Sequence, residues 1–340
     1  MYSPPPGPPR IHILGVGNLG RLFAHALANT PNPPPITLIL HRPSLLSDWE
    51  SAGRSISITT HGLTNSAGVY DIEEPIHSGS GMIENLIVAT KTLHTAKALE
   101  AVKHRLNAQS TVLFTQNGMG TTEEVTRLIF PEDARRPNYL AAITSHGVYS
   151  EGPFRSVFAG QAHVSVGLVS GSSAKSRYLL DQIVAAKLLN ATEFESRELR
   201  LLQLEKLVIN AMINPLTVVY NCRNGELLKR SDIMSVMRDL LAEASQVVSS
   251  LPELRTREDG GNDVAERFSN ENLKAKVLDV AEKTAANTSS MLQDFRAGRE
   301  TEVGYINGYI SKRGKELGIN VGNNERIVEM VQKRKVVEDE

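Results

Sequence analysis

The chain has 340 residues, of which 41% are hydrophobic and 22% charged, and its 37 basic and 38 acidic residues leave a net charge of -1. This balance excludes a general nucleic-acid-binding or membrane-surface protein, since such proteins carry an excess of Lys and Arg. The single cysteine, Cys222, excludes a disulfide framework and a zinc site made of thiolates, so a reducing compartment fits the composition.

The first ten residues, MYSPPPGPPR, are rich in proline and contain one Arg. They lack the apolar core of a secretory signal and the several arginines of a transit peptide. The longest apolar run, at residues 207–220, is interrupted by two Asn and a Pro, so no membrane span is predicted. We therefore expect residues 1–10 to be a disordered leader and the protein to be cytoplasmic.

Short apolar runs alternate with helical patterns in the first half of the chain. Strands are predicted at residues 11–14, 36–40, 86–89, 111–115, 140–144 and 164–168, and helices notably at 95–106 and 123–129. Such alternation is typical of βαβ units with a mostly parallel sheet. Residues 11–195 are therefore expected to form a Rossmann-type, doubly wound α/β domain.

The pattern changes near residue 195, after which helical periods continue almost without strands. Helices are predicted at residues 197–219, 231–249, 271–296 and 301–317, with a loop at 251–263. Residues 196–332 are therefore expected to form an all-helical domain, followed by a charged tail at 333–340.

The segment Gly15-Val16-Gly17-Asn18-Leu19-Gly20 has the spacing of a dinucleotide-binding loop, follows a predicted strand and opens a predicted helix. Gly15 permits a tight turn, Gly17 lets the backbone approach a pyrophosphate, and Gly20 allows close packing of helix on strand. The helix N-terminus offers N–H groups and a partial positive charge to the phosphates. An ordinary glycine turn is the alternative, but this context favours a nucleotide.

The end of the second predicted strand distinguishes NAD from NADP. An NAD enzyme usually ends this strand with Asp or Glu, whereas this chain continues Leu40-His41-Arg42-Pro43. Arg42 could bind a 2′-phosphate through two hydrogen bonds, although a solvated surface Arg is the simpler alternative. The position of Arg42 favours NADPH as the cofactor.

Two further segments follow predicted strands at the same edge of the sheet. Lys91 follows the strand at 86–89, and Asn117 follows the strand at 111–115. Because ligands of open α/β sheets bind outside the carboxyl ends of the strands, both are candidate cofactor or substrate contacts. Ordinary turn chemistry is the alternative for each.

A polar stripe runs along the apolar helix predicted at 197–219. Lys206, Asn210 and Asn214 recur every four residues and therefore share one side of the helix. The stripe could be a solvated face, but Asn is a mediocre helix former, so we favour donors lining a cleft. Apolar surroundings would lower the pKa of Lys206, which suits a general acid that protonates a carbonyl oxygen during hydride transfer.

Small polar residues and a carboxylate come together late in the chain. Asn287, Ser289 and Ser290 offer hydrogen bonds, and Glu302 follows them. Ordinary helix capping explains such residues in most proteins, so the residues alone leave their role open.

The chain resembles the ketopantoate reductases (2-dehydropantoate 2-reductases) from Ile11 to about Gln332. The blocks that carry the resemblance are GVGNLG, QNGMGT, KLVINAMINPLT, NCRNGEL, NTSSMLQD and TEVGYINGY. Several blocks in the same order are far more specific than the glycine loop alone. The resemblance implies a Rossmann domain joined to a helical domain.

The resemblance also implies roles for residues at the substrate. Lys206 is similar to the catalytic lysine of the family, and Glu302 to the glutamate that engages the 4-hydroxyl of the substrate. Ser290 is similar to the serine that binds the substrate carboxylate. The further substrate-binding residues implied are Asn117, Asn210, Asn214 and Asn287.

On the cofactor side, the resemblance implies that Arg42 binds the 2′-phosphate and that Lys91 and Asn117 lie near the cofactor. Two positions depart from the family pattern. His94 stands where relatives can carry Gln, and Gly304 stands where an acid can occur. Neither departure removes Lys206 or Glu302, so we expect an active enzyme that requires no metal.

The expected reaction is reduction of 2-dehydropantoate to pantoate by NADPH, in pantothenate and coenzyme A synthesis. One alternative is a reductase of another branched 2-oxo acid on the same scaffold. Another is a catalytically silent NADP-binding sensor protein. The expected partner is the small-molecule substrate, and the expected assembly is a monomer or a homodimer.

Overall fold

The computed structural model describes residues 8–74, 81–254 and 262–334. The chain divides into two compact units. The first contains the residues up to Gln116 together with Thr121–Arg200, and the second contains Asn117–Gly120 together with the residues from Leu201 onward. The two-domain prediction placed a single boundary between residues 195 and 196, so it did not assign residues 117–120 to the second unit.

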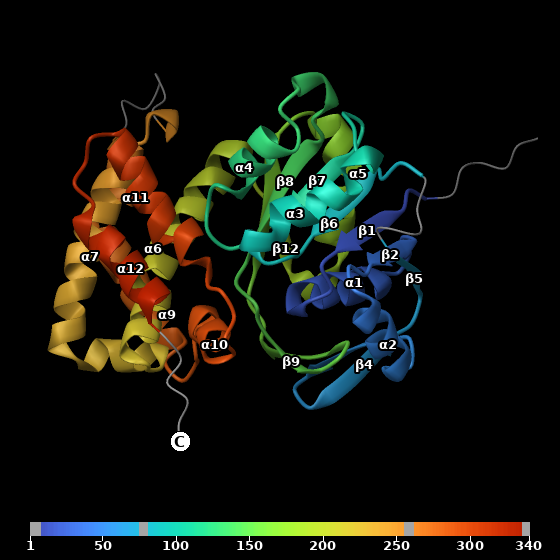
Figure 1. Ribbon diagram of the computed structural model, residues 1–340, viewed down its shortest axis with the longest axis horizontal. Helices are drawn as coiled ribbons and strands as arrows, with labels where there is room; N and C mark the ends of the chain where they lie inside the picture. Colours follow the sequence, from blue (N-terminus) through green and yellow to red (C-terminus); the bar gives the residue numbers. More distant parts are fainter. Residues whose placement is uncertain (1–7, 75–80, 255–261, 335–340) are drawn as a thin grey trace, which may run out of the picture. The chain divides into compact units, whose positions relative to one another are not determined.

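The first unit is built on a sheet of eight strands (Figure 1). Their order in the sheet is β5 (Tyr70–Glu73), β2 (Ile36–Ile39), β1 (Ile11–Leu14), β6 (Asn85–Val88), β7 (Thr111–Phe114), β8 (Asn138–Thr144), β11 (Val164–Ser170) and β12 (Ala191–Glu193). The six strands from β5 to β8 are parallel, and β11 runs antiparallel to β8. The prediction of a doubly wound, mostly parallel Rossmann-type sheet is confirmed.

Helices cover both faces of this sheet because neighbouring side chains of a strand point to opposite faces. Helices α1 (Asn18–Ala28) and α5 (Ser173–Ala185) pack on the face that carries Ile11 and Ile13. Helices α3 (Thr92–Val102) and α4 (Thr121–Leu128) pack on the opposite face. The order of strands reverses between β1 and β6, which is where such folds bind ligands.

A second sheet of four strands was not predicted. Its order is β4 (Leu63–Ala67), β3 (Ile56–Thr60), β10 (Arg155–Gly160) and β9 (Gly147–Gly152). Phe154, before β10, packs with Trp49 of α2 (Pro43–Ser51), and Arg21 of α1 donates to the carbonyl of Gly152 at 2.9 Å. The sequence hides this sheet because β4 is largely exposed and polar and so lacks the alternation of a half-buried strand.

The second unit is helical, apart from the segment 117–120. Its α-helices are α6 (Ser196–Tyr220, in this unit from Leu201), α7 (Ser231–Ser249), α8 (Asn262–Arg267), α9 (Asn270–Lys283), α10 (Ser290–Arg296), α11 (Asn307–Glu316) and α12 (Gly322–Lys333). Its 3-10 helices are η4 (Asn224–Lys229), η5 (Pro252–Leu254) and η6 (Glu302–Tyr305), and the first unit has η1 (Lys103–Arg105), η2 (Asp133–Arg135) and η3 (Lys187–Leu189). One apolar core joins α6, α7, α9, α11 and α12.

The helices predicted at 197–219 and 231–249 are confirmed by α6 and α7, whereas two other predictions are wrong. The single helix expected at 271–296 is two helices, α9 and α10, because Ser289 caps a new helix by accepting from the backbone N–H of Leu292. The helix expected at 301–317 begins with the 3-10 turn η6. Helix α12 was missed, and residues 255–261 of the loop expected at 251–263 lie outside the described residues.

The described ends of the chain are attached to the fold. Pro9 accepts a hydrogen bond from the Tyr178 hydroxyl at 2.8 Å, and Arg334 donates to the carbonyls of Val218 and Val219. Residues 1–7 of the predicted leader and 335–340 of the predicted tail lie outside the described residues. None of the helices in the described ranges combines the length and the hydrophobicity that a membrane span requires.

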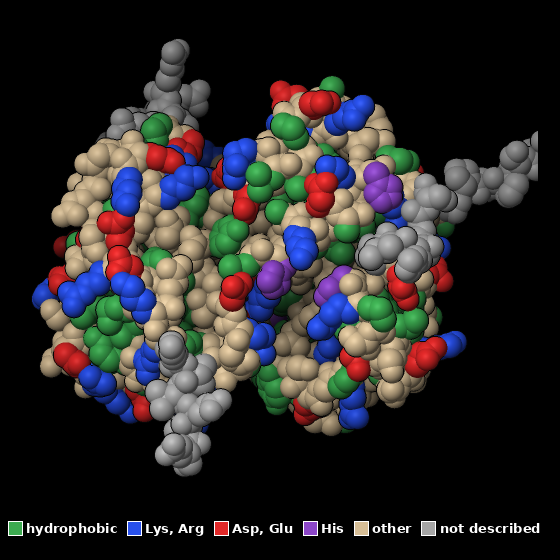
Figure 2. Space-filling model, viewed as in Figure 1, with side chains coloured by type: hydrophobic (Ala, Val, Ile, Leu, Met, Phe, Trp, Pro, Cys, Tyr) green, Lys and Arg blue, Asp and Glu red, His purple; other side chains and the backbone are tan. Residues whose placement is uncertain are grey.

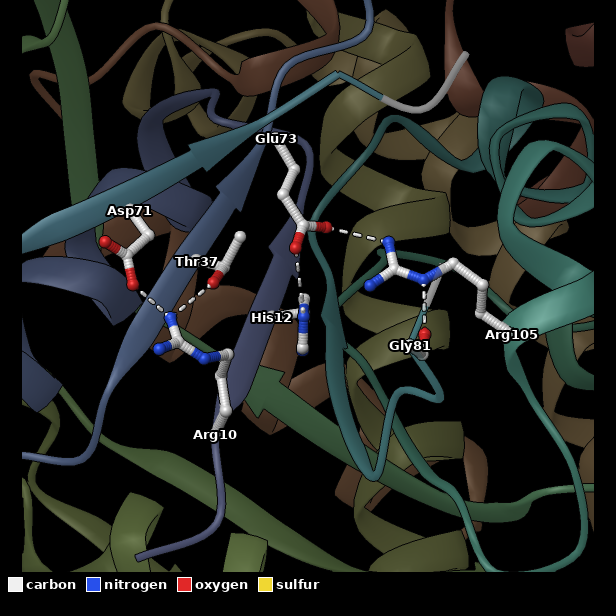
Figure 3. A network of polar contacts seen from close by, with 7 residues as sticks. All are labelled: Arg10, His12, Thr37, Asp71, Glu73, Gly81 and Arg105. Atoms are coloured by element: carbon white, nitrogen blue, oxygen red, sulfur yellow. Dashed lines mark hydrogen bonds and ion pairs between the residues drawn. The ribbon is translucent and has the colours of Figure 1, made fainter. Parts of the chain in front are cut away.

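A polar network crosses one face of the sheet at β1, β2 and β5 (Figure 3). His12 of β1 lies 3.8 Å from the Glu73 carboxylate, whose other oxygen accepts from Arg105 at 2.7 Å. Arg10 donates to Thr37 and also pairs with Asp71. Burial lowers the pKa of His12 to about 4, because desolvation outweighs the opposing charge of Glu73. His12 is therefore neutral at pH 7, and its contact with Glu73 is not an ion pair there.

This buried histidine makes the first unit sensitive to acid. In the unfolded chain His12 takes up a proton below pH 6.5, whereas in the folded chain it does so only near pH 4. The free energy of unfolding should therefore fall by about 2 kcal/mol between pH 7 and pH 5 through this group alone.

We expect His12→Val to flatten this pH dependence, measured by urea unfolding with the fluorescence of the single tryptophan, Trp49, as the probe. His104→Gln, in which an exposed histidine of the same unit is replaced, is the matched comparison and should leave the slope unchanged. Equal slopes in wild type and His12→Val would contradict the assignment.

Candidate active site

The glycine loop between β1 and α1 is shaped by the packing of the first unit. Gly15 has φ +99°, and a Cβ on it would lie 2.6 Å from the backbone nitrogen of Thr90. A Cβ on Gly20 would lie 1.9 Å from the carbonyl oxygen of Gly15. Both positions therefore require glycine for the close approach of β1, α1 and the end of β6.

Gly17 is different, because nothing in the fold requires a glycine there. Its φ of -70° is ordinary, and a Cβ would meet no described atom within 4 Å. It precedes the first turn of α1, in which Asn18 and Leu19 are half-buried, whereas Val16 is buried and its carbonyl accepts from Arg21 at 2.9 Å. The space beside Gly17 is thus open next to the first turn of α1, and N–H groups of a helix N-terminus can bind phosphate.

The strands on either side of β1 end at the same level. Leu14 pairs with Ile39 of β2 and with Val88 of β6, so the segments that follow these strands flank the glycine loop. Arg42 follows β2 as the N-cap of α2, and Lys91 follows β6 as the N-cap of α3. The side chains of both are exposed.

The helices that follow these three strands share an unusual charge pattern. Helices α1, α2 and α3, each described in full, have no acidic residue in the first turn, whereas α4 after β7 has Glu123 and Glu124. Acidic residues are favoured at helix N-termini and cations are disfavoured. The basic caps of α2 and α3 therefore fit an anionic ligand at the ends of β1, β2 and β6.

Two histidines join this basic group. Partial burial lowers the pKa of His41, and the neighbouring Arg42 and His94 lower it further. His94, in the first turn of α3, is thus close to His41 after β2. Figure 2 shows histidine side chains beside Lys and Arg side chains on the visible surface of this unit.

The second unit holds the predicted catalytic helix, α6. Lys206 and Asn210 are half-buried and Asn214 is buried, so the polar stripe is not a freely solvated face. Burial lowers the pKa of Lys206 to about 8, although the carboxylate of Glu302 acts in the opposite direction. A lysine with this pKa can donate a proton near neutral pH.

Residues 117–120 bring the side chain of Asn117 to Glu302. The Asn117 side-chain nitrogen lies 3.4 Å from a carboxylate oxygen of the buried Glu302. The backbone N–H of Met119 donates to the carbonyl of Tyr305 at 2.9 Å, and a Cβ on Gly118 would lie 2.4 Å from that carbonyl oxygen. Gly118, with φ +79°, thus lets the segment pack directly on η6 and places Asn117 beside Glu302.

Asn287 and Ser290 lie at the start of α10, and both are exposed. The buried serine there is Ser289, whose hydroxyl lies 2.6 Å from that of Thr217 on α6. The structure thus brings Lys206, Glu302 and Asn117 together, and the contacts of Asn287 and Ser290 with a substrate remain predictions.

Sequence reasoning missed how the NCRNGEL block supports this turn. The backbone N–H groups of Asn224 and Gly225 donate to the carbonyls of Asn287 and Ala285, both at 3.1 Å. A Cβ on Gly225 would lie 2.5 Å from the Cβ of Ala285, so only glycine allows this approach. An Asn-Gly pair before a helical pattern predicts a turn, but it does not identify the segment on which this turn packs.

In the described parts of the chain, no group of three or more His, Cys, Asp and Glu residues could hold a metal ion. The parallel sheet with its glycine loop, and the lysine of lowered pKa on a helical unit, are typical of a nicotinamide-dependent oxidoreductase. Residues 11–171 match the family model described as ketopantoate reductase PanE/ApbA, and residues 198–335 match its C-terminal counterpart. The chain belongs to the ketopantoate reductase family.

Similar proteins with two different substrates in their names are found. The ketoisovalerate reductase BEA2 of Gibberella fujikuroi is 32% identical, with 91% of this chain and 79% of that protein covered. A probable 2-dehydropantoate 2-reductase of Schizosaccharomyces pombe is 29% identical, with 95% and 96% covered. These relatives indicate a reduction of ketopantoate reductase type acting on a small-molecule keto acid.

Solved structures share the fold. A PanE/ApbA family ketopantoate reductase from Ralstonia eutropha has a TM-score of 0.77 at 22% identity, with 95% of this chain and 97% of that chain covered. D-mandelate dehydrogenase with NADH and anilino(oxo)acetate has a TM-score of 0.74 at 21% identity, with the same coverage.

Proposed function

We propose that the protein reduces 2-dehydropantoate to pantoate with NADPH, in the synthesis of pantothenate and coenzyme A. The observation that carries this proposal is the environment of the Lys206 amine in a chain of this family. Burial lowers the pKa of Lys206 to about 8, Glu302 acts on the amine through its charge, and Asn117 contacts Glu302. The residues of the second unit then supply the proton and orient the substrate.

Lys206 acts as the general acid. NADPH, when bound, supplies the hydride that is added to C2 of the keto acid. Negative charge then develops on the carbonyl oxygen, and the Lys206 ammonium stabilises it and transfers a proton to it. Asn210 and Asn214, on the same side of α6, and Ser290 and Asn287, near the start of α10, bind the carbonyl and carboxylate ends of the substrate.

Glu302 has two tasks in this proposal. Its carboxylate accepts the 4-hydroxyl of 2-dehydropantoate, and Asn117 holds it in place. Its charge also raises the pKa of Lys206 against the effect of burial. More of the amine is therefore protonated at neutral pH than burial alone would allow.

The residues at the end of the sheet fit NADPH. The loop from Gly15 to Gly20 would hold the pyrophosphate, because Gly17 leaves space in front of α1. Arg42 would pair with the 2′-phosphate, and Lys91 and Asn117 would lie along the cofactor. The basic caps of α2 and α3, with no acid in either first turn, support the additional phosphate of NADPH over the bare ribose of NADH.

A keto acid without the 4-hydroxyl is the second candidate substrate. The 32% identity to a fungal ketoisovalerate reductase favours it. The two candidates differ at Glu302, since only 2-dehydropantoate offers this carboxylate a hydroxyl. The charge interaction between Lys206 and Glu302 argues against a catalytically silent sensor.

The substrate is tested by following NADPH oxidation with 2-dehydropantoate and with 2-oxoisovalerate. We expect kcat/KM to be at least about tenfold higher for 2-dehydropantoate, because the buried Glu302 would otherwise lose a hydrogen-bond partner. Glu302→Ala should reduce turnover of 2-dehydropantoate most. Comparable turnover of both acids by the wild type would favour the ketoisovalerate-type alternative.

Lys206→Ala should lower kcat by about 10²–10⁴ while NADPH binding, measured by cofactor fluorescence, stays nearly unchanged. In the wild type, kcat for reduction should fall as the pH rises through about 8, because the amine loses the proton that it donates. Lys283→Ala, which changes an exposed lysine of the same unit, is the control. An unchanged kcat in Lys206→Ala would rule out the general acid.

Arg42→Ala should weaken NADPH binding by about 10- to 100-fold and NADH binding much less, because only NADPH presents a phosphate to the guanidinium. Both dissociation constants can be measured by fluorescence titration. Arg155→Ala, an exposed arginine of β10 in the same unit, should change neither. Equal weakening of both cofactors would show that Arg42 does not bind the 2′-phosphate.

A further inference from the structure

Helix α6 contains a proline directly after its polar stripe. Pro215 lies inside the helix, one residue beyond Asn214. Proline has no backbone N–H, so the carbonyl of Ala211, four residues earlier, cannot receive its usual helical hydrogen bond. This carbonyl is buried in the core of the second unit, where an unsatisfied acceptor is costly.

A side chain from another helix supplies the missing donor. The Asn307 side-chain nitrogen donates to the carbonyl of Ala211 at 3.0 Å. Asn307 is the first residue of α11, it is completely buried, and it follows η6, the turn that begins with Glu302. The hydrogen bond that Pro215 removes from α6 is thus replaced by a donor from the segment that contains Glu302.

The orientation of this amide is fixed by its neighbours. The Asn324 nitrogen donates to the Glu243 carboxylate at 2.8 Å and to the carbonyl of Leu240 at 3.2 Å. The Asn324 oxygen is therefore an acceptor, and it receives the second N–H of Asn307 at 3.1 Å. Both N–H groups of Asn307 are used, and its amide cannot rotate without losing both hydrogen bonds.

Two links therefore join α6 to the segment from η6 to α11. Lys206 interacts with Glu302, and five residues further along each segment Ala211 accepts from Asn307. The first link is electrostatic and long in reach, whereas the second is a hydrogen bond with a defined length and direction. The second can thus hold the separation on which the first depends.

We propose that Asn307 is a positioning residue, whose hydrogen bond to the Ala211 carbonyl holds the turn of Glu302 beside Lys206. The catalytic consequence rests on the proposed function, in which Lys206 is the proton donor. The effect of Asn307 on the pKa of Lys206 does not rest on the proposed function, because this pKa is a property of the protein without substrate or cofactor.

The test uses the full chain and measures the titration of Lys206. The amines are ¹³C-methylated, and the NMR signal of Lys206, assigned with Lys206→Arg, is followed against pH. In Asn307→Ala the Glu302 turn should lie less closely against α6, so Lys206 should titrate at a lower pH than in the wild type. With 2-dehydropantoate, kcat should fall about 10- to 100-fold, and the pH at which it falls should move down in parallel.

A second substitution separates positioning from filling a missing hydrogen bond. Pro215→Ala restores an N–H that can donate to Ala211 within α6. In Asn307→Ala/Pro215→Ala we expect the urea midpoint to recover while the titration of Lys206 stays shifted, because the link to η6 is still absent. Recovery of both would show that Asn307 only satisfies a carbonyl, and would overturn the proposal.

A matched control removes a different hydrogen bond of the same unit. The Ser245 hydroxyl donates to the carbonyl of Phe268 at 2.7 Å, so Ser245→Ala should lower stability without moving the titration of Lys206. If Asn307→Ala does not fold, Asn324→Ala removes the residue that orients Asn307 and should give a smaller shift in the same direction. An unshifted Lys206 in the folded variant overturns the inference, whereas a shifted Lys206 without turnover of any 2-oxo acid overturns the proposed function alone.

Discussion

The proton transfer proposed for this protein depends on how burial of the Lys206 amine is balanced against the Glu302 carboxylate. Burial alone favours the neutral form of Lys206, which could not donate a proton. The charge of Glu302 alone would raise the pKa of Lys206, so the amine would release its proton less readily. Together they place its pKa at about 8. The packing around α6, η6 and residues 117–120 maintains this balance, because small changes in separation alter both the desolvation of the amine and its attraction to the carboxylate.

The first unit uses electrostatics in a different way. Its charges lie at helix N-termini that already carry partial positive charge, so the apo-protein concentrates repulsion at the ends of β1, β2 and β6. Binding of a phosphate-containing anion there would relieve this repulsion. The acidic first turn of α4, after the next strand, limits the basic region to the strands that flank the reversal of the sheet.

Strong periodic signals predicted much of this structure from the sequence. Strand β1 and helix α7 have the predicted bounds, since both are buried along a regular face. The break between α9 and α10 was missed because residues 284–289 (TAANTS) contain no Pro or Gly, and only the cap at Ser289 marks the new helix. The exposed strand β4 offered no alternation of apolar residues.

The candidate site was predictable only in part. The polar stripe of α6 follows from spacing, but the approach of Glu302 to Lys206 joins residues almost a hundred positions apart, and only the family resemblance pointed to it. Asn307 gave no signal of its own. An Asn at the start of a helix is typical of a cap, and its hydrogen bond to Ala211 becomes evident only when the carbonyl freed by Pro215 is located in space.

The segment 117–120 makes the helical unit discontinuous along the chain. Met119 belongs to the apolar core of that unit, and its N–H is a partner of the Tyr305 carbonyl. A fragment cut at residue 201 would therefore lack part of its own core and the asparagine beside its acid. A recombination event that exchanged the helical unit between relatives would also have to transfer residues 117–120. We therefore expect the two units to be inherited together.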